Sequence, residues 1–194
     1  MDIHHNAAMV TPDGKPLAVL GALRGFNVKQ TTGADLFENV VQSGSSKHFL
    51  YGGKPGVAQK LVDAMSKKYP NAEFVGSITP PFRKLTTQEK IDYQSKIINS
   101  KADVVWVGLS TPKQENWMYE NYQALPCTLI GVGAAFDFHT GEVKRAPKFL
   151  TNMMLEWVYR VACEPRRLGR RYFKVVPQFL LFLGLDWIRG TSSR

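Results

Sequence analysis

The chain has 194 residues, of which 44% are hydrophobic and 21% are charged, so it can bury a core of its own and is not a disordered protein. The net charge of +9 is unevenly distributed: residues 1–143 hold 14 Lys and Arg against 13 Asp and Glu, whereas residues 144–174 hold nine against two. A nearly neutral body with one basic segment argues against a protein that coats nucleic acid and favours a localised anionic partner.

The cysteines and the N-terminus bear on the cellular compartment. Neither Cys127 nor Cys163 lies in a CxxC motif, and no His/Cys spacing suggests zinc, so we expect no metal site. No apolar stretch of signal-peptide length occurs at the N-terminus, and the longest apolar stretch, residues 175–188, contains Pro, Gln and Asp and is too short to span a bilayer. These features predict a cytoplasmic protein.

Short apolar runs alternate with helical patterns in the first two thirds of the chain. Strands are predicted at residues 48–53, 72–77, 102–110 and 127–135, and helices at residues 55–70, 86–100 and 112–123. Thr86 or Thr87 is the expected N-cap of the second helix. This alternation predicts an α/β fold with a mainly parallel sheet flanked by helices.

Three of the predicted strands end in small or polar residues that lead into helices: YGGKPG, GLSTPKQE and GVGAAFDF. Open parallel sheets bind ligands beyond the carboxyl ends of their strands, and such turns can present backbone N–H groups to a phosphate. Ordinary strand-to-helix turns are the alternative. The third turn lacks the last glycine of a dinucleotide-binding fingerprint.

A basic, amphipathic segment begins at residue 144. One helix is predicted from Pro147 to Cys163 and a second from Pro165, because proline suits the first turn of a helix. Six of the fifteen residues in RVACEPRRLGRRYFK (160–174) are basic. The pattern suits a helix at an anionic bilayer surface, and equally a helical hairpin that packs on the sheet with a solvated basic face.

Polar candidates for chemistry are few. Asp13 lies in a Pro-Asp-Gly turn, Gln114 and Glu115 begin a helix, and Asp137 and His139 follow a predicted strand. Each also has a plain structural explanation, as a turn residue, a residue of a helix's first turn, or a core histidine. No Ser/His/Asp or Cys/His relay is indicated.

The order of the motifs is more specific than any one of them. The motifs are TPDGKP (11–16), TTGADLFENV (31–40), LYGGKPGVAQKL (50–61), YPNAEFVGSITPPF (69–82), ADVVWVGLSTPKQENWM (102–118), IGVGAAFDFHTGEVKRAPKF (130–149) and LEWVYRVACEPRRLGRRY (155–172). Together they resemble the WecG/TagA/CpsF glycosyltransferase family. The resemblance implies a Rossmann-like α/β core that binds a UDP-sugar, residues 1–146, and a helical appendage that docks on the membrane, residues 147–194.

The resemblance also implies an activity. Family members are inverting, metal-independent enzymes that move N-acetylmannosamine, its uronic acid or glucose from a UDP-sugar to a polyprenyl-diphosphate-linked saccharide. They act in cell-surface polysaccharide biosynthesis, including exopolysaccharide synthesis, peripherally on the inner face of the plasma membrane. No cofactor is expected beyond the UDP-sugar substrate. The expected partners are the lipid-linked acceptor and the anionic membrane surface, without nucleic acid, and homo-oligomer formation is left open.

Roles for individual residues follow from the same resemblance. Asp13 matches the proposed catalytic base, and Gln114 matches a glutamine that contacts substrate. The arginines that close over the diphosphate are matched by Arg160, Arg167 and Arg170. Guanidinium groups suit the negative charge that grows on a leaving UDP. The strand-end turns described above add Gly52, Gly53, Gly131, Gly133 and Asp137 to the predicted substrate-binding set.

Two differences from the family leave a second function open. Members usually have a further segment before the Pro-Asp-Gly motif, and they tend to have Arg-Val-x-Gly where this chain has Gln30-Thr31-Thr32-Gly33. The alternative is a catalytically inactive, membrane-associated binding or scaffold member of the family.

Overall fold

The structure is a computed structural model that describes residues 2–191. Within this range the description excludes the side chains of Asp2, Lys148, Asn152, Arg167, Arg171 and residues 186–191. The chain divides into two compact units, Met1–Lys144 and Arg145–Arg194. Sugar-nucleotide binding and membrane docking, the roles predicted for the two parts of the chain, stay predictions.

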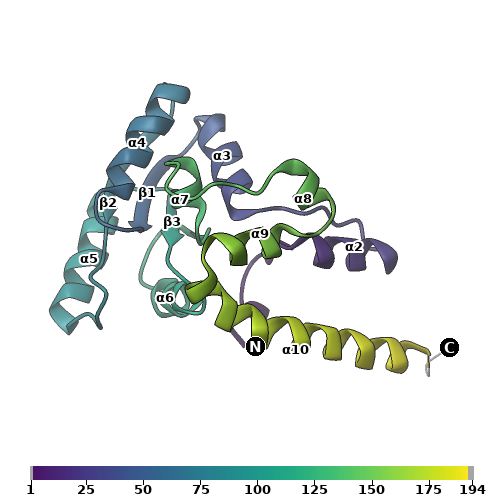
Figure 1. Ribbon diagram of the computed structural model, residues 1–194. Coiled ribbons are helices and arrows are strands. Elements are labelled where there is room, and N and C mark those ends of the chain that lie inside the picture. Colours follow the sequence, from purple (N-terminus) through teal and green to yellow (C-terminus); the bar gives the residue numbers. More distant parts are fainter. Residues whose placement is uncertain (1, 192–194) are drawn as a thin grey trace. The chain divides into compact units, whose positions relative to one another are not determined.

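A parallel sheet forms the centre of the first unit (Figure 1). Its strands are β1 (Lys47–Gly52), β2 (Glu73–Ile78), β3 (Val104–Gly108) and β4 (Thr128–Gly131), in the order β2-β1-β3-β4. Every pairing in this sheet is parallel. The predicted α/β fold with a mainly parallel sheet is therefore confirmed.

Helices connect the strands as the alternation of patterns predicted. The first unit contains α1 (Asp2–His5), α2 (Lys15–Leu23), α3 (Gly33–Ser43), α4 (Val57–Lys68), α5 (Thr87–Asn99), α6 (Lys113–Asn121) and α7 (Ala135–His139). The three helices predicted between the strands are α4, α5 and α6, each one or two residues shorter at either end. The strand predicted at 127–135 is wrong beyond Gly131, because Gly133 adopts a positive φ of 55° and α7 begins at Ala135.

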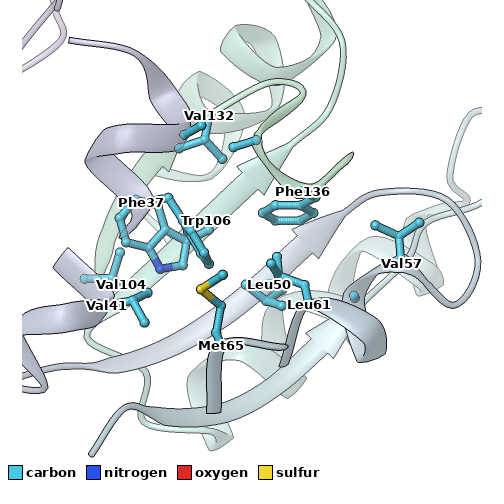
Figure 2. Packing of buried hydrophobic residues seen from close by; sticks show 13 residues of the cluster. Phe37, Val41, Leu50, Val57, Leu61, Met65, Val104, Trp106, Val132 and Phe136 are labelled. Carbon is cyan, nitrogen blue, oxygen red and sulfur yellow. The ribbon is translucent and has the colours of Figure 1, made fainter. Parts of the chain in front are cut away.

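Side chains that alternate along the strands bury two apolar layers, one on each face of the sheet. On one face Leu50 and Trp106 pack against α3, α4 and α7, and the ring of Phe37 meets Trp106 edge-on with centroids 4.9 Å apart (Figure 2). On the other face Tyr51 and Val107 are buried with Ile97 of α5. Burial of such large apolar side chains stabilises the unit by about 1.5–3 kcal/mol each.

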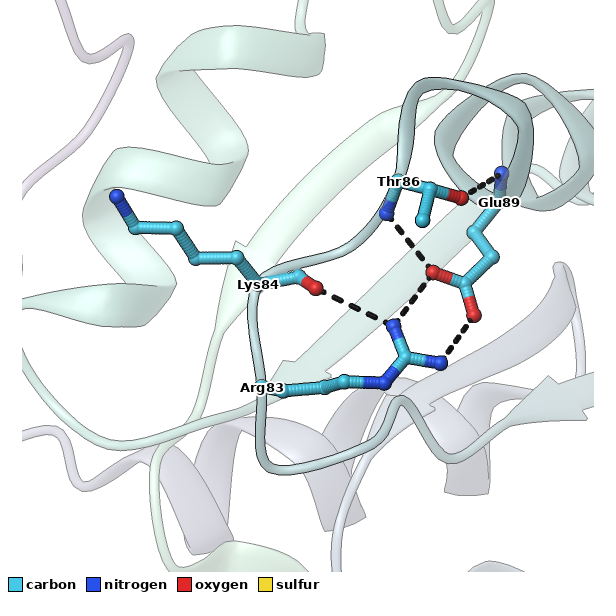
Figure 3. Close-up of polar contacts among 4 residues, drawn as sticks. All are labelled: Arg83, Lys84, Thr86 and Glu89. Carbon is cyan, nitrogen blue, oxygen red and sulfur yellow. Dashed lines mark hydrogen bonds and ion pairs between the residues drawn. The ribbon is translucent and has the colours of Figure 1, made fainter.

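The start of α5 is fixed by a capping box. Thr86 accepts a hydrogen bond from the backbone N–H of Glu89 at 3.2 Å, and the Glu89 carboxylate accepts one from the backbone N–H of Thr86 at 2.8 Å. Arg83 also donates both terminal nitrogens to this carboxylate, each at 2.7 Å (Figure 3). Thr86 is thus the N-cap. The Arg83 guanidinium lowers the pKa of Glu89 to about 2.

The second unit is helical over its described residues, with α8 (Lys148–Asn152), α9 (Glu156–Cys163) and α10 (Pro165–Thr191). The predicted start of a helix at Pro165 is confirmed. Trp157 of α9 packs against Tyr172 of α10, with ring centroids 5.9 Å apart. No helix in the described part of the chain combines the length and the apolar character needed to cross a membrane.

The single helix predicted from Pro147 to Cys163 is wrong, because the chain breaks between α8 and α9. Met154 adopts a left-handed φ of 61°. The backbone N–H of Met154 donates to Thr151 at 3.1 Å and that of Leu155 donates to Leu150 at 2.8 Å. This pair of hydrogen bonds is the Schellman motif that ends helices, here with methionine in the position where glycine is usual.

Candidate active site

Three glycines lie together where the parallel strands end. Gly52 of β1 pairs with Gly108 of β3, and Gly131 of β4 pairs with Val107 one residue earlier. Gly52 has a φ of 121°, and a Cβ placed there would lie 2.5 Å from the Gly108 carbonyl oxygen. The backbones of β1 and β3 therefore approach each other so closely at this edge that only glycine fits at position 52.

The side chain of Gln114 joins two of the turns at this edge. Gln114 lies in the first turn of α6, is only 8% exposed, and accepts a hydrogen bond through Oε1 from the backbone N–H of Gly133 at 2.9 Å. Its Nε2 donates to Glu115 Oε1 at 3.2 Å. A Cβ at Gly131 would lie 2.7 Å from Gln114 Nε2, so glycine at this position makes room for the carboxamide.

Two predicted phosphate donors are already engaged within the protein. The Gly53 N–H donates to the Gly108 carbonyl at 3.0 Å, and the Gly133 N–H donates to Gln114. These two groups support the shape of the turns and are not open donors in this structure. For the predicted contact with substrate, Gln114 retains one N–H of Nε2 and the second lone pair of Oε1.

Asp13 is exposed and lies two residues before α2. The backbone carbonyl of Asp13 accepts a hydrogen bond from Gln30 Nε2 at 2.8 Å, and the carbonyl of Pro12 accepts one from the Thr31 N–H at 3.1 Å. Gln30, in the stretch where the sequence differs from the family, therefore holds the turn that carries the predicted base.

A second set of contacts connects this turn to the end of the sheet. Thr32 caps α3 by accepting a hydrogen bond from the Asp35 N–H at 3.1 Å. At the next residue, Gly33, a Cβ would lie 2.7 Å from the Val132 carbonyl oxygen in the turn after β4. The backbone of Asp13 is thus tied to the segment that packs at the carboxyl end of β4, beside Gly133.

Asp137 and His139 lie on the short helix α7. Asp137 is half-buried in the first turn of α7, where a carboxylate is stabilised by the N–H groups of the helix start. His139 Nε2 lies 3.0 Å from the Ala34 carbonyl oxygen, which links α7 to α3 and supports a structural role. Within residues 2–191 no three His, Cys, Asp or Glu side chains gather in a way that could hold a metal ion.

The predicted diphosphate-binding arginines belong to the second unit. Arg160 is half-buried on α9, Arg170 is exposed on α10, and the side chain of Arg167 lies outside the described residues. Their role toward a diphosphate stays a prediction.

Glu115 was named with Gln114 as a polar candidate at a helix start, but it was not among the predicted substrate-binding residues. Its Oε1 accepts hydrogen bonds from Thr111 Oγ1 at 3.0 Å and from Gln114, while its buried Oε2 has no hydrogen-bond partner within the described part of the chain. The sequence feature that could have pointed to Glu115 is its place next to Gln114 after a predicted strand. An ordinary acidic residue in the first turn of a helix has the same feature.

Known proteins resemble this chain over most of its length. The family model for the Glycosyl transferase WecG/TagA/CpsF family matches residues 1–193. A curated relative from Bacillus subtilis (strain 168), N-acetylglucosaminyldiphosphoundecaprenol N-acetyl-beta-D-mannosaminyltransferase, is 29% identical over 174 residues. The alignment covers 87% of this chain and 66% of the relative, so the chain spans less than two thirds of that protein's length. The resemblance found from the order of the motifs is confirmed.

Proposed function

Because the chain belongs to the WecG/TagA/CpsF family of glycosyl transferases, we propose that it transfers a sugar from a UDP-sugar to a polyprenyl-diphosphate-linked saccharide in cell-surface polysaccharide biosynthesis. The observation that carries this proposal is the family match over residues 1–193. The name of the B. subtilis relative, which gives a diphosphoundecaprenol-linked N-acetylglucosamine as acceptor and N-acetylmannosamine as the transferred sugar, supports the two substrate classes.

Asp13 is our candidate for the general base. In an inverting transfer the acceptor hydroxyl attacks the anomeric carbon from the face opposite UDP, and its proton passes to a nearby carboxylate. An exposed carboxylate on a turn held by Gln30 and Thr31 is accessible to a large lipid-linked acceptor. General-base catalysis contributes on the order of 10²–10⁴-fold to such a step.

Departure of UDP requires stabilisation of the growing charge on its β-phosphate. We assign this role to Arg160, Arg167 and Arg170, whose planar guanidinium groups can donate two hydrogen bonds to phosphate oxygens. In this proposal the enzyme needs no metal, and the arginines stabilise the leaving group.

The second unit is our candidate for the membrane-docking part. Its described residues expose apolar side chains on all three helices, including Phe149, Trp157, Phe173, Leu181 and Phe182. Exposed basic side chains lie on α10 as well, at Arg166, Arg170 and Lys174. Apolar and basic side chains together favour binding to anionic lipid headgroups, which would bring the enzyme to its lipid-linked acceptor.

Vesicle co-sedimentation tests the docking role. Phe173→Asp combined with Phe182→Asp should reduce binding to anionic phosphatidylglycerol vesicles, because both substitutions place charge on exposed apolar positions of α10. Phe82→Asp, at an 88% exposed position of the first unit, is the matched control and should leave binding unchanged. Equal binding of all three proteins would show that α10 is not the docking element.

A second function is favoured by one observation. Gln30, which replaces the arginine of the family pattern, uses its side chain to hold the Asp13 turn. A protein that lost a substrate-binding arginine in this way could act as an inactive binding member of the family. Calorimetry with UDP and assay of sugar transfer separate the possibilities: an enzyme binds UDP and forms product, whereas an inactive member forms none.

A further inference from the structure

The carboxylate of Glu115 is fixed in place but only half satisfied. Thr111 Oγ1 and Gln114 Nε2 both donate to Oε1, at 3.0 Å and 3.2 Å. The other oxygen, Oε2, is buried and has no hydrogen-bond partner among the residues that the structure describes. Buried polar atoms in folded proteins are almost always paired, so an unpaired carboxylate oxygen indicates a place that a ligand or a water completes.

The position of Glu115 favours a ligand. The residue follows β3 in the first turn of α6, at the carboxyl end of the parallel sheet, where open α/β sheets bind their ligands. Its neighbour Gln114 is itself held by the Gly133 N–H at 2.9 Å. Two consecutive side chains are therefore locked by contacts with two different turns, which is the kind of pre-organised support that binding sites require.

We propose that Glu115 Oε2 accepts a hydrogen bond from a hydroxyl group of the sugar nucleotide. This inference rests on the proposed function and deepens it. An ionised carboxylate repels the diphosphate, whereas a hydroxyl is a neutral donor and forms a short, charge-assisted bond with it. Both the ribose and the transferred sugar carry such hydroxyls, and in either case Glu115 sets the orientation of the donor substrate.

Glu115→Gln is the primary test variant. It keeps an acceptor for Thr111 but replaces Oε2 with an amide group that donates and cannot accept. Affinities are measured by calorimetry for UDP, 2′-deoxy-UDP, 3′-deoxy-UDP and UDP-N-acetylglucosamine. Glu120→Gln is the matched control, because Glu120 lies on the same helix, is exposed, and pairs with Lys90 at 3.3 Å, away from Glu115 Oε1 and its donors.

Two results support the proposal and identify the hydroxyl. If a ribose hydroxyl is the donor, Glu115→Gln weakens UDP binding about tenfold or more. The deoxy-nucleotide that lacks this hydroxyl then binds the wild type and Glu115→Gln with equal affinity. If the transferred sugar supplies it, UDP binds both proteins equally and only UDP-N-acetylglucosamine loses affinity by that factor. Glu120→Gln should stay within about twofold of wild type for every ligand.

Other results overturn the proposal. Wild-type affinity of Glu115→Gln for all four ligands would show that Oε2 contacts none of them. If Glu115→Gln lowers the affinity for all four ligands by the same factor, whichever hydroxyl the ligand lacks, Glu115 only shapes the turn. Glu115→Asp, which keeps the charge but draws Oε2 back by one methylene, should reproduce the selective loss if Glu115→Gln does not fold. Failure of the wild type to bind any uridine nucleotide would overturn the proposed function itself, and this inference with it.

Discussion

Replacement of Gln114 by methionine tests the bridge between the turns after β3 and β4. Methionine has nearly the length of glutamine and is apolar, so it fills the same space without either hydrogen bond. The Gly133 N–H would lose the acceptor that now lies 2.9 Å away, and Glu115 Oε1 would lose one of its two donors, the Gln114 Nε2 at 3.2 Å.

The expected cost follows from the burial of the groups involved. A buried donor left without a partner costs about 1–3 kcal/mol, and the partial exposure of Gly133 places this case near the lower end. We therefore expect Gln114→Met to lower the free energy of unfolding by about 1–2 kcal/mol. For a protein of this size that corresponds to a fall in Tm of about 2–8 °C.

Two measurements check this prediction: urea unfolding followed by circular dichroism, and amide exchange at Gly133 followed by NMR. Exchange at Gly133 should accelerate, because its N–H loses its partner. Gln123→Met is the control, since Gln123 is exposed and its side chain bonds the adjacent Tyr122, and it should change stability by less than about 0.5 kcal/mol. Unchanged stability together with unchanged exchange at Gly133 in Gln114→Met would refute the bridge.

Three further predictions concern the fold that supports the site. Gly52→Ala should prevent folding or strongly reduce soluble yield and Tm, because its Cβ would lie 2.5 Å from a backbone oxygen at a φ of 121°. Thr86→Ala should lower stability to urea by about 1 kcal/mol through loss of the N-cap. Burial lowers the pKa of His48 below 6.5, so stability from the neutral ring is present above pH 6.5 and is lost as pH falls through the native pKa. In His48→Asn, Tm should fall less steeply from pH 6.5 to 5, because the contribution of His48 to the slope of the wild-type unfolding free energy, at most about 1.4 kcal/mol per pH unit, is absent.

Matched variants make each of these predictions refutable. Gly25→Ala has the same kind of positive φ, 83°, but apart from the adjacent residues no described atom lies within 4 Å of the new Cβ, so it should cost much less than Gly52→Ala. Thr87→Ala, one residue inside α5, should be milder than Thr86→Ala. Identical pH slopes in wild type and His48→Asn would show that His48 does not couple protonation to folding.

The parallel sheet could be predicted because its signals are local. Apolar runs such as residues 48–53 and 102–110 are short and bounded by turn residues, and helical patterns of about three turns separate them. The end of β4 could not be predicted, since the apolar run continues through Val132 and Ala135, which are both buried although the chain turns at Gly133. Likewise, the break after α8 uses Met154 in a conformation for which glycine is the usual signal.

The sequence names candidate site residues one by one, and their roles stay predictions, but it does not show how these residues are connected. Gln114 and Gly133 were both predicted as substrate-binding residues, yet they bind each other across 19 positions of sequence. Gln30 stood out only as a difference from the family, and its contact with the Asp13 turn depends on how distant segments fold together. The unpaired oxygen of Glu115 is a property of packing, which no spacing of residues reveals.

Transfer of sugar to a lipid-linked acceptor tests the central claim most directly. Labelled UDP-N-acetylmannosamine, its uronic acid and UDP-glucose are each offered with a short-chain polyprenyl-diphosphate-N-acetylglucosamine, and the anomeric configuration of the product is read by NMR. We predict one product with inverted configuration, formed without added metal, and a rate about 10²–10⁴-fold lower in Asp13→Asn. Absence of product from every donor, or an Asp13→Asn rate equal to that of wild type, would contradict the account.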